Sequence, residues 1–158
     1  MCFSGTGNTR AVAQGLAGEI GADCLEIEPA RPYSTQDLDY NDETTRATVE
    51  QNEGTARPEI ASAMPDWGNY DTILLGHPIW WGKAPRIMCT LLEQNADSLT
   101  GKQVADFCTS GSSGIGQAAA ELKGIAPNAA WSEGHRFEIG TGGVEAAAWA
   151  RSLGFGIG

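Results

Sequence analysis

The first segment of this sequence that could do chemistry is a run of hydroxyl, amide and glycine residues near the amino end. The run consists of Ser4, Gly5, Thr6, Gly7, Asn8 and Thr9. Backbone N–H groups, small hydroxyl donors and the amino end of a following helix can bind one anion together. The segment therefore indicates a phosphate site that needs no lysine side chain.

A second segment combines two aromatic residues with a glycine. It consists of Pro78, Ile79, Trp80, Trp81 and Gly82. Adjacent tryptophans in a loop cannot both point into the same core, so we expect at least one at the surface or over a ligand. An indole stacked on a flat aromatic ligand adds about 0.5–1.5 kcal/mol beyond its burial. Packing of both indoles on neighbouring helices is the alternative.

A third segment is made almost entirely of serine and glycine. It consists of Thr109, Ser110, Gly111, Ser112, Ser113 and Gly114. Residues this small let the backbone approach a ligand closely, and their N–H and hydroxyl groups can bond the polar edge of a heterocycle. A plain flexible connection between a strand and a helix is the alternative.

The elements that must position these segments alternate between strand and helix. Apolar residues at helical spacing predict a helix over 8–20, which Gly21 ends. Apolar runs without alternation are typical of strands buried on both faces of a parallel sheet. Further helices are expected over 85–92, 115–124 and 144–153, and strands over 24–27, 72–76 and 103–108, with a weak last strand at Trp131 or over 136–139.

This alternation predicts an α/β fold with a parallel sheet. Ligands of such sheets bind outside the carboxyl ends of the strands, where all three polar segments are expected. The stretch 29–66 is polar, and its apolar content is too low for a core of its own. We interpret it as an insertion in one domain spanning 1–158, with a helix over 35–51 that starts at Ser34 or Thr35 and carries Asp37 in its first turn.

Composition excludes several classes of function. The formal net charge of −10 argues against nucleic acid and anionic membrane surfaces, and no apolar run is long enough to span a membrane. No paired carboxylates, no nucleophile with its base and no metal-ligand spacing stand out. The four cysteines form no C-x-x-C pair, and three sit among apolar neighbours, so we expect free thiols in a cytoplasmic protein.

A phosphate, a ring stack and a polar ring edge together describe a flavin mononucleotide (FMN) site, and here the chain resembles the flavodoxin family. The segment Ser4–Thr9, with Ala13 and Leu16 downstream, matches the phosphate loop of that family. Segments 78–82 and 109–114 are similar to the two isoalloxazine loops of one subfamily. The polar insertion of that subfamily is matched by Tyr33, Asp37, Leu38 and Arg46.

The resemblance implies a three-layer α/β/α sandwich with a five-stranded sheet in the order 2-1-3-4-5. It implies FMN as cofactor, with the phosphate held by the side chains of Ser4, Thr6, Asn8 and Thr9 and the N–H groups of Gly5 and Gly7. Trp80 or Trp81 would flank the isoalloxazine, segment 78–82 would meet its redox-active edge, and segment 109–114 would line the other side.

The implied function is electron transfer between redox partner proteins, which would dock through basic surfaces on this acidic chain. The acidic surface would also lower the potential of the bound flavin. We expect a monomer or a weak homodimer. The alternative is an NAD(P)H-dependent quinone or nitro reductase on the same fold, and a partner-binding module without cofactor is a third possibility.

Two further expectations concern the start of the sequence and His77. Only Met1, Cys2 and Phe3 precede the phosphate segment, whereas the family has a longer first strand that ends in an aromatic residue. We therefore expect a truncated first strand, which is either very short or continued by residues upstream. His77 is expected at the surface or in a loop, although it could lie near the flavin.

Overall fold

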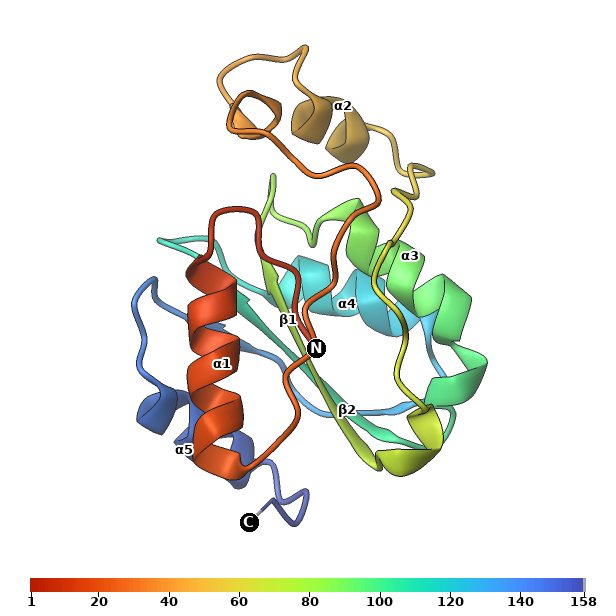
Figure 1. Cartoon of the computed structure of the whole chain (residues 1–158), viewed down its shortest axis with the longest axis vertical. Coiled ribbons are helices and arrows are strands. Elements are labelled where there is room, and N and C mark those ends of the chain that lie inside the picture. Colours follow the sequence, from red (N-terminus) through yellow and green to blue (C-terminus); the bar gives the residue numbers. More distant parts are fainter. Residues whose placement is uncertain (158) are drawn as a thin grey trace.

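Residues 1–157, which the computed structural model describes, fold into a parallel sheet between two layers of helices (Figure 1). The α-helices are α1 (Asn8–Ile20), α2 (Arg46–Asn52), α3 (Arg86–Asn95), α4 (Gly116–Ile125) and α5 (Gly143–Ser152). The strands are β1 (Thr72–Pro78), β2 (Gln103–Thr109), β3 (Ala130–Trp131) and β4 (His135–Phe137), and short 3-10 helices are η1 (Gln36–Leu38), η2 (Trp67–Asn69) and η3 (Asp97–Leu99). Helices α1 and α5 cover one face of the sheet, and α3 and α4 cover the other, which confirms the predicted α/β/α sandwich.

The middle of the sheet is the parallel pair β1 and β2, which runs in register from Thr72 opposite Gln103 to Pro78 opposite Thr109. Both β3 and β4 pair with β2, one at its start and one at its end. Together they form one interrupted edge strand beside β2. Both segments predicted for the weak last strand, Trp131 and residues 136–139, contribute residues to it.

Residues Met1–Phe3 occupy the position of the predicted first strand. Residues Met1–Phe3 lie between residues 25–27 and β1, where Cys2 bridges to both neighbours. The N–H of Phe3 donates to the carbonyl of Gly76 at 3.0 Å. The spatial order thus follows the predicted 2-1-3-4-5, but the first two positions are reduced to isolated bridges beside a four-stranded sheet. The five-stranded sheet is therefore confirmed only in part.

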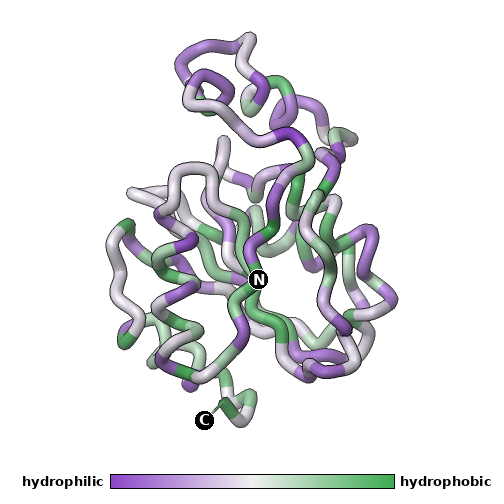
Figure 2. Tube along the Cα trace, in the orientation of Figure 1, coloured by the Kyte–Doolittle hydropathy of each residue, from purple (hydrophilic) through white to green (hydrophobic). Residues whose placement is uncertain are grey.

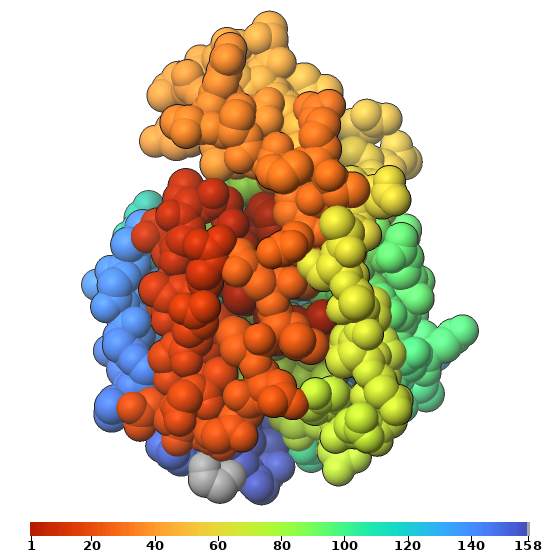
Figure 3. Space-filling model, viewed as in Figure 1, coloured from red at the N-terminus to blue at the C-terminus, as the bar shows by residue number. Residues whose placement is uncertain are grey.

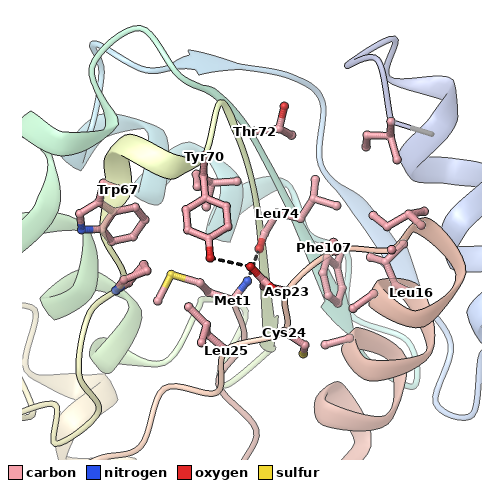
Figure 4. A pocket seen from close by; sticks show the side chains of 18 residues that line it. Met1, Leu16, Asp23, Cys24, Leu25, Trp67, Tyr70, Thr72, Leu74 and Phe107 are labelled. Carbon is pink, nitrogen blue, oxygen red and sulfur yellow. Dashed lines mark hydrogen bonds between the residues drawn. The ribbon is translucent and has the colours of Figure 1, made fainter.

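An apolar cavity of about 350 Å³ lies beyond the amino group of Met1 (Figure 4). Leu16 of α1, Leu74 of β1 and Phe107 of β2 are among the residues that line it. The amino group donates a hydrogen bond of 2.7 Å to the carbonyl of Leu74, and burial lowers its pKa.

Helix α1 confirms the helical period of residues 8–20. It ends at Gly21, whose φ of 67° is left-handed and whose N–H donates to the carbonyl of Ala17. Its apolar side packs on α5 at a very close approach, because a Cβ on Gly143 would lie 2.5 Å from the carbonyl oxygen of Gly15. The position of α1 over the sheet is what carries the phosphate segment to the sheet edge.

The prediction of one helix over 35–51 is wrong, because this stretch contains η1, a turn and α2. The carboxylate of Asp42 accepts from the N–H of Thr44 at 2.8 Å, which favours a turn over a continuous helix. The expected start is correct: Ser34 and Asp37 exchange side-chain-to-backbone bonds across η1. The stretch is largely hydrophilic and forms the upper part of the molecule, above the start of α1 (Figures 2 and 3).

All four cysteines are free, and three of them, Cys2, Cys89 and Cys108, are buried as expected. Burial raises the pKa of each buried thiol, to about 11 for Cys89 and about 12 for Cys2 and Cys108. Across residues 1–157, no helix combines the length and apolar character needed to cross a bilayer.

Candidate functional site

The fold gathers the three polar segments at one edge of the sheet. The hydroxyls of Thr9 and Thr109, one hundred positions apart, lie 2.7 Å from each other in a buried contact. Gly5 faces the indole of Trp80, since a Cβ there would be 3.2 Å from Cζ2. The carboxyl ends of the strands thus bring together segments that the sequence separates widely.

The phosphate segment leaves the amino end of α1 open. Gly7 precedes the helix with a φ of 96°, and no side chain caps the helix start. The N–H of Gly7 donates to Oγ of Ser4 at 3.0 Å, while Thr6 and Asn8 are exposed. The first turn holds no acidic side chain, so the partial positive charge of the helix end is available to an anion.

The two adjacent tryptophans take different environments, as the sequence predicts. Trp80 packs inward, with its ring centroid 5.5 Å from that of Phe3 and 5.4 Å from that of Tyr33. Trp81 is 43% exposed. The structure therefore leaves Trp81 as the indole that is free to cover a ligand.

Trp81 also has an unusual backbone. Its φ is +50°, and the following Gly82 has a φ of +77°. The turn is closed by Trp80 and Lys83, which exchange backbone bonds of 2.8 and 3.1 Å. Two positive φ values are typical of a type I′ turn, where a bulky residue is strained by about 1–2 kcal/mol. Strain of this kind is often found at functional sites.

The third segment is anchored at its base and exposed at its tip. Thr109 and Ser110 are buried, whereas residues 111–114 are exposed. The guanidinium of Arg136 on β4 donates to the carbonyls of Ser110 and Gly111, at 3.1 and 2.7 Å. The sequence did not predict this role of Arg136, because no local pattern shows that it reaches Gly111, 25 residues away.

Two residues of the polar insertion, Leu38 and Gln51, contact the first and second segments, and the sequence did not predict these contacts. Leu38 lies against Gly5, where a Cβ would be 3.6 Å from its Cδ1. Gln51, which was missed, donates from Nε2 to the carbonyl of Trp80 at 2.9 Å and accepts from the N–H of Arg86. The sequence could have indicated Gln51 only by its helical spacing from Ala47 and Thr48, with which it shares the buried face of α2.

The expectation for His77 is wrong. This residue lies in β1 with no exposed surface, and its Nε2 is 3.0 Å from Oδ2 of Asp106 on β2. A polar partner on the neighbouring strand lets an imidazole be buried inside a sheet. Such a partner, 29 positions away, leaves no mark on the local pattern around His77.

The chain is similar in sequence and structure to known flavoproteins. The family model described as Flavodoxin matches residues 1–153. A candidate flavoprotein of Bacteroides eggerthii is 40% identical with a TM-score of 0.88, over 97% of this chain and 94% of its own. Another, of Bacteroides uniformis, is 36% identical with a TM-score of 0.86, over 95% and 94%.

A flavoprotein of Lactobacillus acidophilus, solved in complex with FMN, is also similar to this chain. It is 25% identical with a TM-score of 0.73, over 94% of this chain and 95% of its own. No curated protein matches the chain in sequence.

Proposed function

Because the chain belongs to the flavodoxin family, we propose that it binds FMN and carries electrons between redox partner proteins. The observation that carries the proposal is the meeting of an uncapped helix start and an exposed tryptophan at one sheet edge. The Lactobacillus acidophilus flavoprotein, similar over 94% of this chain, was solved with FMN. Bound FMN supplies the capacity to take up and release electrons.

The residues of the phosphate segment fit a phosphate monoester. The side chains of Ser4, Thr6 and Asn8 and the N–H group of Gly5 would hold its oxygens at the open end of α1. The N–H group of Gly7 and the hydroxyl of Thr9 would join them by exchanging their present partners, Oγ of Ser4 and the hydroxyl of Thr109, for phosphate oxygens. A dianion is favoured there by the helix dipole and by the absence of acidic side chains in the first turn. The one cation of that turn, Arg10, is already paired with Glu26, its Nε lying 2.7 Å from the carboxylate.

The ring of FMN would lie between the second and third segments. Trp81 would cover one face of the isoalloxazine, because Trp80 is occupied by its packing on Phe3 and Tyr33. Segment 109–114 would line the other side, on a base that Arg136 holds in place. Segment 78–82 would meet the redox-active edge of the ring.

The charge of the chain supports a carrier with basic partners. A net charge of −10 disfavours the more negative, reduced form of a bound flavin and so lowers its potential. The same charge attracts partners whose docking surfaces are basic and raises the rate of encounter. We propose that the protein acts as a monomer or a weak homodimer.

Two measurements on purified protein test this function. A carrier is expected to be yellow, to be reduced by dithionite and to leave NAD(P)H unoxidised in steady state. Sustained NAD(P)H oxidation with a quinone or nitro compound as acceptor would instead assign the protein to the reductases. A colourless protein whose spectrum is unchanged after incubation with FMN would refute cofactor binding itself.

A further inference from the structure

A buried histidine–aspartate pair joins the two strands that lead into the second and third segments. His77 precedes Pro78 directly, and Asp106 lies three positions before Thr109. His77 has no exposed surface, Asp106 is 1% exposed, and their Nε2 and Oδ2 atoms are 3.0 Å apart. The pair thus connects β1 and β2 immediately below the candidate flavin site.

The other ring nitrogen of His77 fixes the start of the second segment. Nδ1 lies 2.9 Å from the carbonyl oxygen of Pro78. A carbonyl oxygen only accepts, so Nδ1 must carry a proton and donate it to Pro78. Nε2 is within hydrogen-bond distance of Oδ2, so the two ring nitrogens contact two different strands of the site.

A third part of the chain holds the carboxyl group of Asp106 in place. Gly134, between β3 and β4, lies so close that a Cβ there would be 2.6 Å from Oδ1. This Oδ1 is buried without a hydrogen-bond partner among the described residues. With its carboxyl group confined on this side, Asp106 can hold the imidazole of His77 in one orientation.

We propose that His77 and Asp106 are a positioning pair, which holds the carbonyl of Pro78 and thereby the shape in which segment 78–82 meets the flavin. The inference rests on the proposed function. A buried polar pair is weak evidence of a stabilising role, because apolar residues of the same volume are often as stable or more so. We assign the pair to the second segment because His77 lies one residue before it and bonds to its first carbonyl.

Two substitutions of His77 separate its two contacts. His77→Asn keeps a side-chain N–H at the distance of Nδ1, so it retains the bond to Pro78 and loses the contact with Asp106. His77→Gln keeps an N–H at the distance of Nε2, so it retains Asp106 and loses Pro78. Asp106→Asn is the third variant, since its amide can still donate to Nε2 and fix the orientation of the ring.

The first readout uses apoprotein and needs no flavin. Hydrogen exchange of the Trp80 and Lys83 amides, which are bonded across the turn, is expected to be about 2–10-fold faster in His77→Gln than in wild type, the equivalent of one hydrogen bond. Exchange in His77→Asn and Asp106→Asn is expected to stay within about twofold of wild type. Equal acceleration in His77→Asn and His77→Gln, or none in either, would overturn the proposal.

The second readout is the ratio of the dissociation constants for oxidised and reduced FMN. His77→Gln is expected to change this ratio by about 2–10-fold, with His77→Asn close to wild type. If neither the wild type nor any variant binds FMN, the proposed function fails. The exchange data then still show whether His77 holds the carbonyl of Pro78. An unchanged ratio in a folded His77→Gln variant that binds FMN would refute the effect on the flavin.

A measurement on the wild type covers the case in which the variants do not fold. The ¹⁵N shifts of the His77 imidazole report which nitrogen is protonated. A protonated Nδ1 is required by the bond to Pro78. An unprotonated Nδ1 would remove the contact on which the proposal depends.

Discussion

Replacing Trp81 with asparagine isolates the indole from the turn that carries it. Asn followed by Gly is the favoured pair for a type I′ turn, so Trp81→Asn is expected to keep the positive φ values at this position and at Gly82. The bonds between Trp80 and Lys83 should then persist. What is lost is the exposed ring that we place over the flavin.

The size of the effect follows from the exposure of Trp81. A large aromatic side chain buries about 150–250 Å². With 43% of the residue exposed, about 60–110 Å² is available to a ligand, which corresponds to about 1.5–3 kcal/mol at 25 cal/mol per Å². Ring stacking adds about 0.5–1.5 kcal/mol. We therefore expect FMN to bind about 30- to 2,000-fold more weakly.

Fluorescence titration of the apoproteins with FMN and with riboflavin measures this loss. Both ligands are expected to bind more weakly by the same factor, because we propose that Trp81 covers the ring and not the phosphate. Trp67→Phe, a substitution in η2 beside the cavity at the other end of β1, is the matched control and should retain wild-type affinity. A folded Trp81→Asn variant that binds FMN within threefold of wild type would contradict the placement of this indole over the flavin ring, as would a loss confined to FMN.

Two further predictions concern the packing of the core and its buried thiols. A Cβ on Gly76 would overlap the ring of Phe107, so Gly76→Ala is expected to cost about 2–3 kcal/mol in urea unfolding, and unchanged stability would contradict this packing. A thiol reagent at pH 8 should label the exposed Cys24 at once and the three buried cysteines only on unfolding; rapid labelling of a second thiol would disagree with their burial.

Local patterns predict those elements whose burial is uniform. Helix α1 is predicted correctly because one face is apolar throughout and a glycine in the left-handed conformation ends it. Strands β1 and β2 are predicted because both of their faces are covered by helices, which requires continuous apolar runs. In these elements, local preference and tertiary packing agree.

Elements that depend on distant or competing contacts are predicted poorly. The helix expected over 35–51 is interrupted because the carboxylate of Asp42 satisfies local backbone groups. The last strand is split where Gly134 passes the carboxyl group of Asp106. His77 is buried because Asp106 faces it from the next strand. None of these contacts is visible in the residues next to each position.

The candidate site divides in the same way. The three segments are predicted because their unusual composition is local, and the strand ends bring them to one edge. Gln51 and Arg136, which hold the second and third segments by side-chain bonds to backbone carbonyls, are not predicted. Polar residues of this kind are common on surfaces, and only the fold shows which carbonyls they reach.

We propose above all that this chain binds FMN through its phosphate at the start of α1. Calorimetric titration of the wild-type apoprotein tests it most directly, with FMN and riboflavin compared under the same conditions. We predict binding of FMN at one molecule per chain, with riboflavin clearly weaker because it lacks the phosphate. Absence of FMN binding, or equal affinity for the two ligands, would contradict binding of FMN through its phosphate.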